Sequence, residues 1–278
     1  MRDYAYYNGT FTPYDAAAVP LSDRSIFFAD AVYDVMLGRG KRIYQADEHI
    51  DRLTANAYAV GLSELPTKSE LIDTMEYLIE AAEANNFMLY VQLSGKEKRR
   101  SHSREERGVN LLMTVTSIEC PYELKLVDAI TLPDLRYGYC NLKTTNLLPA
   151  VLSMSEAEKN GCELAIFQRN GIVTEASLAN VSIISDGTLV THPHDSSILP
   201  GISERNLTEA CGRLGVGHEV RYFTVDEMLN ANLVLITSTT KLVKACRSID
   251  GVMLSLQDFD LAKQIFTLLR EDLIIKTS

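Results

Sequence analysis

The sequence Asn-Leu-Lys-Thr-Thr-Asn-Leu-Leu, residues 141–148, decides how the fold of this chain is interpreted. Its lysine, Lys143, stands among short polar side chains. A strand-like run over residues 126–132 leads to it, and a helix is predicted over residues 146–160, where Gly161 ends it. A lysine at such a junction is either a solvated side chain or an amine held in a polar site.

A second stretch, Arg-Asn-Gly-Ile-Val-Thr-Glu at residues 169–175, predicts a β-hairpin, because Asn-Gly is the strongest short signal for a tight turn. Glu175 follows that turn by four residues. A lysine and a glutamate on neighbouring strands of one pocket are what a pyridoxal phosphate enzyme needs. The lysine forms the Schiff base, and the carboxylate keeps the pyridine nitrogen protonated. Either residue alone would indicate little, since most lysines and strand glutamates face water.

Composition narrows the class of protein. The 278 residues suffice for two domains, 46% of them are apolar, and 23% are charged, which is typical of a folded chain. The net charge of -10 argues against nucleic-acid binding. No segment resembles a signal peptide or a membrane span, and the five cysteines form no CxxC pair, so we expect a soluble cytoplasmic protein with reduced thiols. Two histidines, at 192 and 194, have no third ligand nearby, so no metal is assigned.

The order of predicted elements indicates an α+β fold of two domains, because strands and helices do not form a run of βαβ units. We predict a small N-terminal domain over residues 1–119, a linker region over 120–131 and a larger C-terminal domain over 132–278. The first domain is predicted to contain an aromatic-rich strand at 27–35, a helix at 47–60, a second helix opened by a capping box at 67–70, and strands at 87–94 and 109–118.

The second half predicts a β-meander followed by helices. After the hairpin over residues 163–175, strands are expected at 179–185 and 188–191. Ser203 is predicted to cap a helix that continues through Leu214. The remaining expected elements are a capping box at 224–227, a strand at 233–236 and a C-terminal helix.

Residues 141–148, followed by Thr-Glu-Ala-Ser at 174–177 and Asn180-Val181, resemble the core of the fold-type IV pyridoxal phosphate enzymes. That family includes D-amino acid, branched-chain and amine aminotransferases and aminodeoxychorismate lyase. The resemblance runs through nearly the whole chain. It implies a small N-terminal α/β domain, a larger C-terminal mixed β/α domain that binds pyridoxal 5'-phosphate, and a homodimer with its active site at the subunit interface.

The resemblance also implies roles for individual residues. Lys143 is the catalytic lysine and Glu175 holds the pyridine nitrogen. Arg136 lies close to the cofactor, although a surface strand residue is the other interpretation. Arg52, on the helix face opposite Ile50, is either solvated or reaches the phosphate. The remaining phosphate ligands are Ile202 and Ser203 at a helix N-terminus and Thr239 at a strand end.

Substrate binding is where subfamilies differ. Arg100-Ser101-His102 resembles the carboxylate-binding site that the neighbouring subunit contributes in D-amino acid aminotransferases, although a solvated charge run is the plain alternative. Tyr33 matches a tyrosine that lines the pocket, with a core aromatic as the alternative. Two departures concern substrate contacts: residues 176–179 carry fewer hydroxyls than is usual, and Lys241 adds a cation.

The sequence therefore predicts a D-amino acid aminotransferase of the D-alanine type, which converts 2-oxoglutarate to D-glutamate. Its partners would be small amino and 2-oxo acids, with no nucleic acid and no membrane. Branched-chain or (R)-amine aminotransferase and aminodeoxychorismate lyase remain alternatives of the same fold. A pyridoxal phosphate-binding protein without turnover, or an acidic binding domain without cofactor, are alternatives of other classes.

Overall fold

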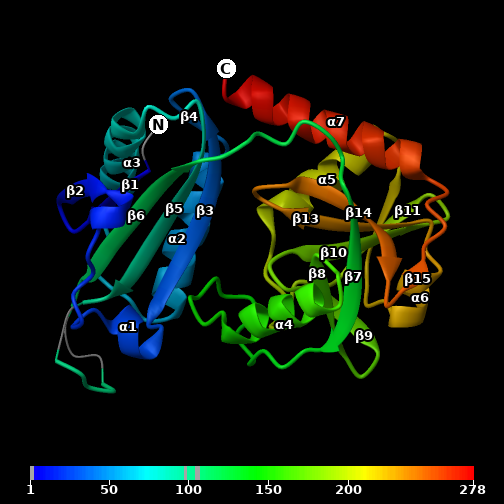
Figure 1. The fold of residues 1–278 in the computed structure, drawn as a ribbon, viewed down its shortest axis with the longest axis horizontal. Coiled ribbons are helices and arrows are strands. Elements are labelled where there is room, and N and C mark those ends of the chain that lie inside the picture. The colour runs from blue at the N-terminus through cyan, green and yellow to red at the C-terminus, as the bar shows by residue number, and fades with distance from the viewer. Residues whose placement is uncertain (1–2, 97–98, 104–106) are drawn as a thin grey trace. The chain divides into compact units, whose positions relative to one another are not determined.

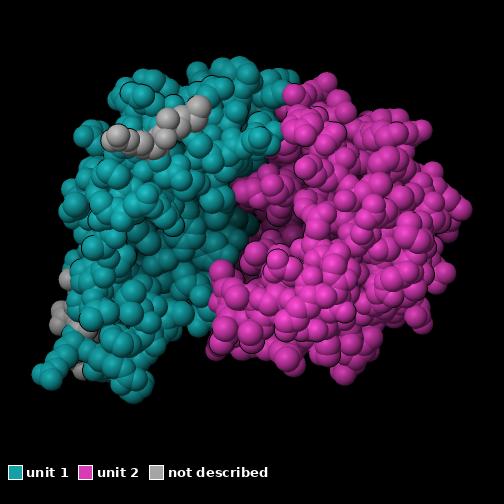
Figure 2. All heavy atoms as spheres, viewed as in Figure 1, with its two compact units in different colours: residues 1–120, 142–146, 273–278 teal, residues 121–141, 147–272 magenta. Residues whose placement is uncertain are grey.

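The computed structural model describes residues 3–96, 99–103 and 107–278 (Figure 1). The chain divides into two compact units (Figure 2). Each unit has its own sheet and hydrophobic core. Unit 1 contains residues 1–120, 142–146 and 273–278, and unit 2 contains residues 121–141 and 147–272.

This division differs in detail from the domains predicted from the sequence. The first break, after Cys120, lies at the start of the predicted linker. Most of that linker belongs to unit 2, where strand β7 (Leu126–Pro133) occupies its second half. The segment 142–146, which carries Lys143, returns to unit 1. Hydrophobic periodicity contains no signal for such a return, because the segment is short and polar.

Unit 1 is an antiparallel six-stranded sheet with two long helices, α2 and α3, on one face. The strand order is β2-β1-β6-β5-β3-β4. Strand β5 alternates apolar residues into the core that both helices share, as a half-buried strand should. The elements are β1 (Tyr4–Tyr7), β2 (Thr10–Pro13), α1 (Arg24–Phe28), β3 (Ala31–Arg39), β4 (Arg42–Ile43), α2 (Ala46–Ala59), α3 (Lys68–Ala82), β5 (Asn86–Gly95) and β6 (Val109–Ser117).

The predicted strand over residues 27–35 is wrong at its beginning. Residues 24–28 form the short helix α1 instead, because the Asp23 carboxylate accepts a hydrogen bond from the Ser25 N–H at 2.8 Å and so caps a helix. Ala29 ends the helix in the left-handed conformation, with φ of 46°, and β3 begins at Ala31. The predicted helix at 47–60 and the capping box of Thr67 and Glu70 are confirmed.

Unit 2 is built on a nine-stranded mixed sheet. The order is β12-β11-β10-β13-β14-β7-β8-β9, with β15 paired to β14. Three pairs are parallel: β7 with β14, β7 with β8, and β11 with β12. Besides β7, the elements are α4 (Leu148–Lys159), β8 (Leu164–Arg169), β9 (Ile172–Ala176), β10 (Asn180–Ser185), β11 (Thr188–Thr191), α5 (Ile202–Arg213), β12 (Gly217–Val220), α6 (Val225–Leu229), β13 (Leu233–Ser238), β14 (Leu242–Ile249), β15 (Val252–Met253) and α7 (Phe259–Lys276), whose last residues belong to unit 1.

The predicted hairpin is confirmed, because β8 and β9 pair across Asn170 and Gly171, which both have positive φ. The capping box of Thr224 and Glu227 is confirmed as well. The prediction that Ser203 caps α5 is wrong. Gly201 is the N-cap, and Ser203 is the second residue inside the helix. Within the described part of the chain, no helix has both the length and the apolar character needed to cross a membrane.

Candidate active site

The residues predicted to form the site fall into two groups, one in each unit, and neither unit contains them all. Unit 1 contains Tyr33, Arg52, Arg100, His102 and Lys143. Unit 2 contains Arg136, Glu175, Ile202, Ser203, Thr239 and Lys241. Within each unit, the hydrogen bonds show which of these side chains are brought together.

In unit 1, Lys143 lies in an irregular segment fastened along the start of β3. The Tyr33 N–H donates to the Lys143 carbonyl at 2.9 Å, and the Thr145 N–H donates to the Ala31 carbonyl at 3.1 Å. The ammonium of Lys143 lies 4.5 Å from the centre of the Tyr33 ring, so these two predicted residues do meet. The expectation that Lys143 occupies a strand next to that of Glu175 is wrong, because its segment contains no strand and belongs to unit 1.

The polar side chains after Lys143 hold its segment in place. Thr145 Oγ1 and Asn146 Nδ2 both donate to the carbonyl of Ala29, at 3.1 and 3.2 Å. That carbonyl belongs to the left-handed residue that ends α1, where the regular helix bonding stops. Next to this turn is a pocket of about 430 Å³, the size of a small-ligand site, lined by Arg24, Phe28, Asp30, His102, Thr144 and Asn146 among others.

Arg52 is held by a carboxylate that the sequence did not single out. Its Nε and one terminal nitrogen donate to the two oxygens of Asp34 at 2.8 and 2.9 Å, and His49 Nδ1 lies 2.8 Å from the same carboxylate. The Asp34 side chain is fully buried and that of Arg52 is 14% exposed, so Arg52 is not a solvated arginine. Its contact with a phosphate stays a prediction.

Opposing effects act on the protonation of Asp34. Burial alone would raise the pKa of its carboxyl, but the hydrogen bonds from His49 and Arg52 and the charge of Arg52 outweigh burial and lower the pKa well below its ordinary value. Two sequence signals could have identified this cluster. Asp34 is the one acidic residue in a mostly apolar strand, and His49 and Arg52 are three residues apart on one helix.

Arg100 and His102 are brought together by one aromatic ring. The Arg100 guanidinium lies 5.4 Å from the centre of the Phe28 ring, and the His102 ring centroid lies 5.4 Å from that of Phe28. Both side chains are exposed. The two predicted carboxylate-binding residues are therefore neighbours on one surface of unit 1, as a site for a small acid requires.

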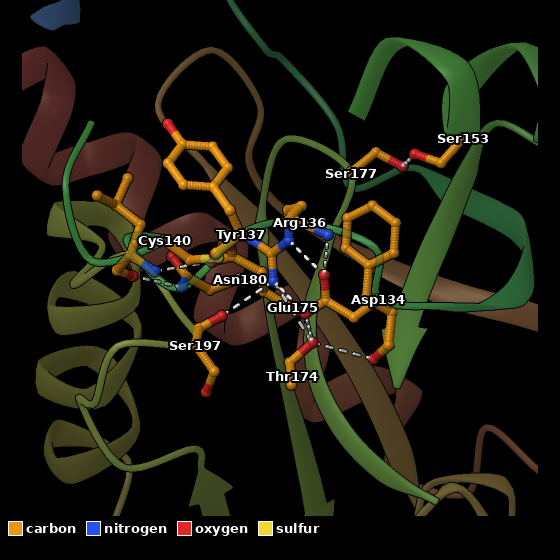
Figure 3. A network of polar contacts seen from close by, with 12 residues as sticks. Asp134, Arg136, Tyr137, Cys140, Ser153, Thr174, Glu175, Ser177, Asn180 and Ser197 are labelled. Carbon is orange, nitrogen blue, oxygen red and sulfur yellow. Dashed lines mark hydrogen bonds and ion pairs between the residues drawn. The ribbon is translucent and has the colours of Figure 1, made fainter. Parts of the chain in front are cut away.

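In unit 2, Arg136 connects two buried carboxylates (Figure 3). Its guanidinium donates to Asp134 at 2.8 and 2.9 Å and also pairs with Glu175. The side chain is only 12% exposed, so Arg136 is not a surface residue. The other Glu175 oxygen accepts the Leu199 N–H at 2.9 Å, which fixes the carboxylate at two points.

Charges in this cluster balance. Two carboxylates, Asp134 and Glu175, face two guanidinium groups, Arg136 and Arg169, the latter 3.1 Å from Asp134. Burial would raise the pKa of Asp134, but the hydrogen bonds and charge of Arg136 and the charge of Arg169 lower it. Burial acts against the charge of Arg136 too, yet Asp134 and Glu175 raise its pKa. Separating these charges would leave a buried charge without its partner, which costs several kcal/mol. The side chains are therefore held in this arrangement.

The beginning of α5 has the features of an anion site. Gly201 precedes the helix, and a Cβ at this position would overlap the side-chain oxygen of Asn180, so the backbone approaches β10 closely. Asn180 lies opposite Thr237 on β13, whose buried hydroxyl has no hydrogen-bond partner among the described residues. A phosphate at this helix N-terminus would accept from the N–H groups of Ile202 and Ser203, so the donors fit the predicted cofactor.

Thr239 and Lys241 follow the end of β13. Thr239 is half-buried and the Lys241 side chain is exposed, while the Lys241 N–H donates to the Ser238 carbonyl at 3.3 Å. In these positions Thr239 offers a hydroxyl and Lys241 a positive charge, as a neighbouring anion site would require. Their roles stay predictions.

Comparisons with known proteins agree with these features. The family model for class IV aminotransferases matches residues 31–249. A D-alanine aminotransferase from Bacillus licheniformis is 31% identical over 98% of both chains. A D-alanine aminotransferase from Listeria monocytogenes is 33% identical over 86% of this chain and 85% of the relative.

Solved structures share the fold. A branched-chain aminotransferase from Thermoproteus uzoniensis, crystallised with norvaline, superposes with a TM-score of 0.86 over 97% of this chain and 94% of its own, at 20% identity. A putative 4-amino-4-deoxychorismate lyase from Legionella pneumophila gives 0.84 over 92% and 96%, at 21% identity. These likenesses confirm the predicted α+β two-domain fold of the fold-type IV enzymes.

The buried Asp34 yields a prediction about stability and pH. Asp34→Asn should destabilise the protein at pH 7 by about 3–5 kcal/mol, because it leaves Arg52 in a buried site without its charge partner. Since the folded-state pKa of Asp34 is lowered, its contribution is fully present above the unfolded pKa and is lost as pH falls below about 4. Denaturant unfolding at pH 7, 5 and 3.5 should show the difference between wild type and variant shrinking only at the lowest pH.

The matched control is Asp51→Asn, whose carboxylate is 69% exposed and pairs with Lys68. It should change stability by no more than about 0.5 kcal/mol at any of these pH values. A difference between wild type and Asp34→Asn that stays constant down to pH 3.5 would show that the carboxylate of Asp34 does not carry the charge described here.

Proposed function

Because the chain belongs to the class IV aminotransferases, we propose that it transfers the amino group of D-amino acids of the D-alanine type to 2-oxoglutarate, giving 2-oxo acids and D-glutamate. The predicted enzyme class, an aminotransferase that uses pyridoxal phosphate, is confirmed by this membership. The observation that carries the choice of a D-amino acid is the placement of Arg100 and His102 side by side at Phe28.

Pyridoxal phosphate, when bound, supplies an electron sink for the bonds at the amino acid's Cα. The hydrogen bonds around Lys143 fix its backbone, so that Nζ would hold the cofactor covalently and, once the substrate amine has displaced it, would take and return the proton of the substrate Cα as a free amine. Glu175 would accept a hydrogen bond from the protonated pyridine nitrogen. Arg136 and the Leu199 N–H support it by holding the carboxylate in one orientation.

The phosphate would be held by Ile202, Ser203 and Thr239 with the charge of Arg52. The position of Ile202 and Ser203 in the first turn of α5 and the close approach of Gly201 to β10 support this assignment in unit 2. Asp34 supports Arg52, because a bidentate pair fixes the guanidinium plane while its positive charge remains close to the helix surface.

The substrate carboxylate would bind to Arg100 and His102, with Tyr33 lining the pocket. The cofactor activates either enantiomer in the same way, so the position of the carboxylate decides which Cα–H bond faces the base. A guanidinium fixes that position with two parallel hydrogen bonds, and an imidazole adds a third. Lys241 is a second cation that can contribute to the same contact.

We also propose a homodimer, with the active site at the subunit interface. An apolar patch on unit 2 supports it: Leu148, Val151 and Leu152 on α4 and the nearby Leu178 are each more than half exposed. Helix α4 and the turn at Leu178 are joined by the hydrogen bond between Ser153 and Ser177. Contiguous exposed apolar residues of this kind mark protein interfaces.

Light scattering tests the homodimer. The wild type should have about twice the chain mass of 31.0 kDa. Leu152→Glu should lower the average mass at the same concentration, because it buries a charge in the interface. Lys159→Glu, which changes an exposed charge on the same helix, is the control. A wild-type mass of one chain would contradict the proposal.

We place the enzyme in the cytoplasm. Its five cysteines are free thiols, as expected for proteins of a reducing compartment. Burial raises the pKa of Cys211 and of Cys246 to about 12, so neither thiol is ready to react at neutral pH.

A spectral test with two enantiomers examines the activity. The purified holoenzyme should absorb visible light, D-alanine should bleach that absorbance, and L-alanine should not. Lys143→Ala should lose this response while keeping the fold, and borohydride should attach the cofactor to the peptide containing Lys143. Turnover of L-leucine in preference to D-alanine would establish the branched-chain alternative instead. A borohydride label on Lys241 would contradict the role of Lys143.

Glu175→Gln should keep the cofactor bound but slow proton transfer. It removes a charge-assisted interaction of about 1.5–3 kcal/mol, which corresponds to roughly a tenfold to hundredfold lower rate. Single-turnover bleaching by D-alanine measures this rate. Glu163→Gln is the control, since that carboxylate is exposed and pairs with Lys244. An unchanged single-turnover rate in Glu175→Gln would remove Glu175 from the mechanism.

A further inference from the structure

Arg24, a residue that has no role in the proposed chemistry, is bonded to the backbone of the segment that carries Arg100 and His102. It is the first residue of α1 and is only 6% exposed. One terminal nitrogen donates to the Ser101 carbonyl at 2.7 Å and to the Ser103 carbonyl at 3.4 Å, and the other donates to the His102 carbonyl at 3.5 Å. Its Nε donates to the Asp30 carboxylate at 2.6 Å.

The hydrogen bonds from Arg24 supply partners that regular secondary structure does not provide in this segment. Residues 99–103 lie in neither a helix nor a strand, so their carbonyls lack regular backbone partners. A planar guanidinium can reach several acceptors in fixed directions, whereas the compact ammonium of a lysine cannot span them. Asp30 compensates the charge, which makes burial of the cation tolerable. Arg24 therefore fixes the path of three consecutive residues.

Phe28, one turn further along α1, orders the side chains of the same segment. Its ring contacts Arg24, with the guanidinium 4.9 Å from the ring centre, and lies at 5.4 Å from both Arg100 and His102. The backbone of residues 101–103 and the two exposed side chains are thus held from one five-residue helix.

Helix α1 is itself anchored to the sheet. The Asp23 carboxylate that caps it is buried and accepts hydrogen bonds from Tyr7, Ser94 and Asn110 at 2.9 to 3.0 Å. A Cβ on Gly95 would lie 2.9 Å from Cδ of Arg24, so only glycine lets the arginine pass β5. Strands β1, β5 and β6 therefore fix the position of Arg24.

We propose that Arg24 is a positioning residue for substrate specificity: it holds residues 101–103 so that Arg100 and His102 meet the substrate carboxylate. The inference rests on the proposed function, because it takes these two residues as the carboxylate site. Arg24 and His102 also line the pocket of about 430 Å³ next to the segment of Lys143. Loosening Arg24 should weaken binding of the carboxylate and leave the chemistry at Lys143 intact.

The test compares kinetic constants in a double-mutant cycle. Arg24→Lys keeps the positive charge but loses the planar guanidinium that reaches several carbonyls. It should raise KM for D-alanine roughly tenfold and change kcat by no more than about twofold, as expected when ground-state binding is lost. Arg100→Ala should raise KM by at least as much. Adding Arg24→Lys to Arg100→Ala should then raise KM by a smaller factor than it does in wild type, because the part of its effect that acts through Arg100 is already lost and only the part through His102 remains. Arg42→Lys, an exposed arginine of the same unit, is the control and should match wild type.

Hydrogen exchange supplies a readout that does not depend on activity. Amides of the peptide covering residues 99–103 should exchange faster in Arg24→Lys than in wild type, with the melting temperature nearly unchanged. If Arg24→Lys does not fold, Asp30→Asn serves with the same readouts, because it leaves the arginine in place and removes its charged partner.

The outcomes separate two kinds of failure. An unchanged KM in Arg24→Lys, with a raised KM in Arg100→Ala, would overturn the positioning role. The positioning role would also be overturned if the increase in KM of the double variant equalled the product of the two single increases, since that would show that Arg24 and Arg100 act independently. A wild type that does not turn over D-alanine would instead overturn the proposed function, and exchange in residues 99–103 would still report whether Arg24 holds the segment.

Discussion

The part of the proposed site that lies in unit 1 depends on the turn between α1 and β3. The carbonyl of Ala29, in the left-handed conformation that ends α1, accepts from Thr145 and Asn146 and so fastens the segment of Lys143. From the same helix, Arg24 holds the backbone of residues 101–103 and Phe28 contacts the side chains of Arg100 and His102. One short element therefore positions both Lys143, the amine proposed to react, and the groups proposed to bind the substrate, although they are about forty residues apart in sequence. In the proposed homodimer, Arg100 and His102 serve the active site of the neighbouring subunit, so this shared support connects the two sites of the dimer.

Each unit holds an arginine of the proposed site with buried carboxylates. Asp34 holds Arg52 in unit 1, and Asp134 with Glu175 holds Arg136 in unit 2. Desolvating two charges costs several kcal/mol per ion, so such a pair adds little net stability compared with apolar residues of the same volume. What it provides is orientation, because a bidentate carboxylate leaves a guanidinium one plane and one position. The lowered pKa values of Asp34 and Asp134 mean that these pairs remain charged across the neutral range.

Local signals in the sequence predicted most of the regular elements. They did not predict the side-chain contacts between residues that are distant in sequence. The Asn170-Gly171 turn and the capping boxes at Thr67 and Thr224 are set by residues within four positions, so they could be recognised. Helix α1 was missed because Phe27 and Phe28 favour strands, and the cap at Asp23 outweighs that preference. Asp34, Asp134 and Arg24 act through partners distant in sequence, and the return of segment 142–146 to unit 1 depends on hydrogen bonds to Ala29. No periodicity records such contacts.

The way Arg100 is held differs from that of Arg52 and Arg136, and the difference follows from its proposed task. A guanidinium that must accept a substrate carboxylate cannot already be neutralised by a protein carboxylate. Among the described residues, Arg100 has no ion pair and instead lies over Phe27 and Phe28, at 5.8 and 5.4 Å from the ring centres. A cation–π contact uses the face of the guanidinium, whereas hydrogen bonds to a carboxylate use its edge, so the two are compatible. This explains why α1 presents a half-exposed phenylalanine, Phe27, toward solvent. The ring orders the arginine without consuming the charge that binding requires.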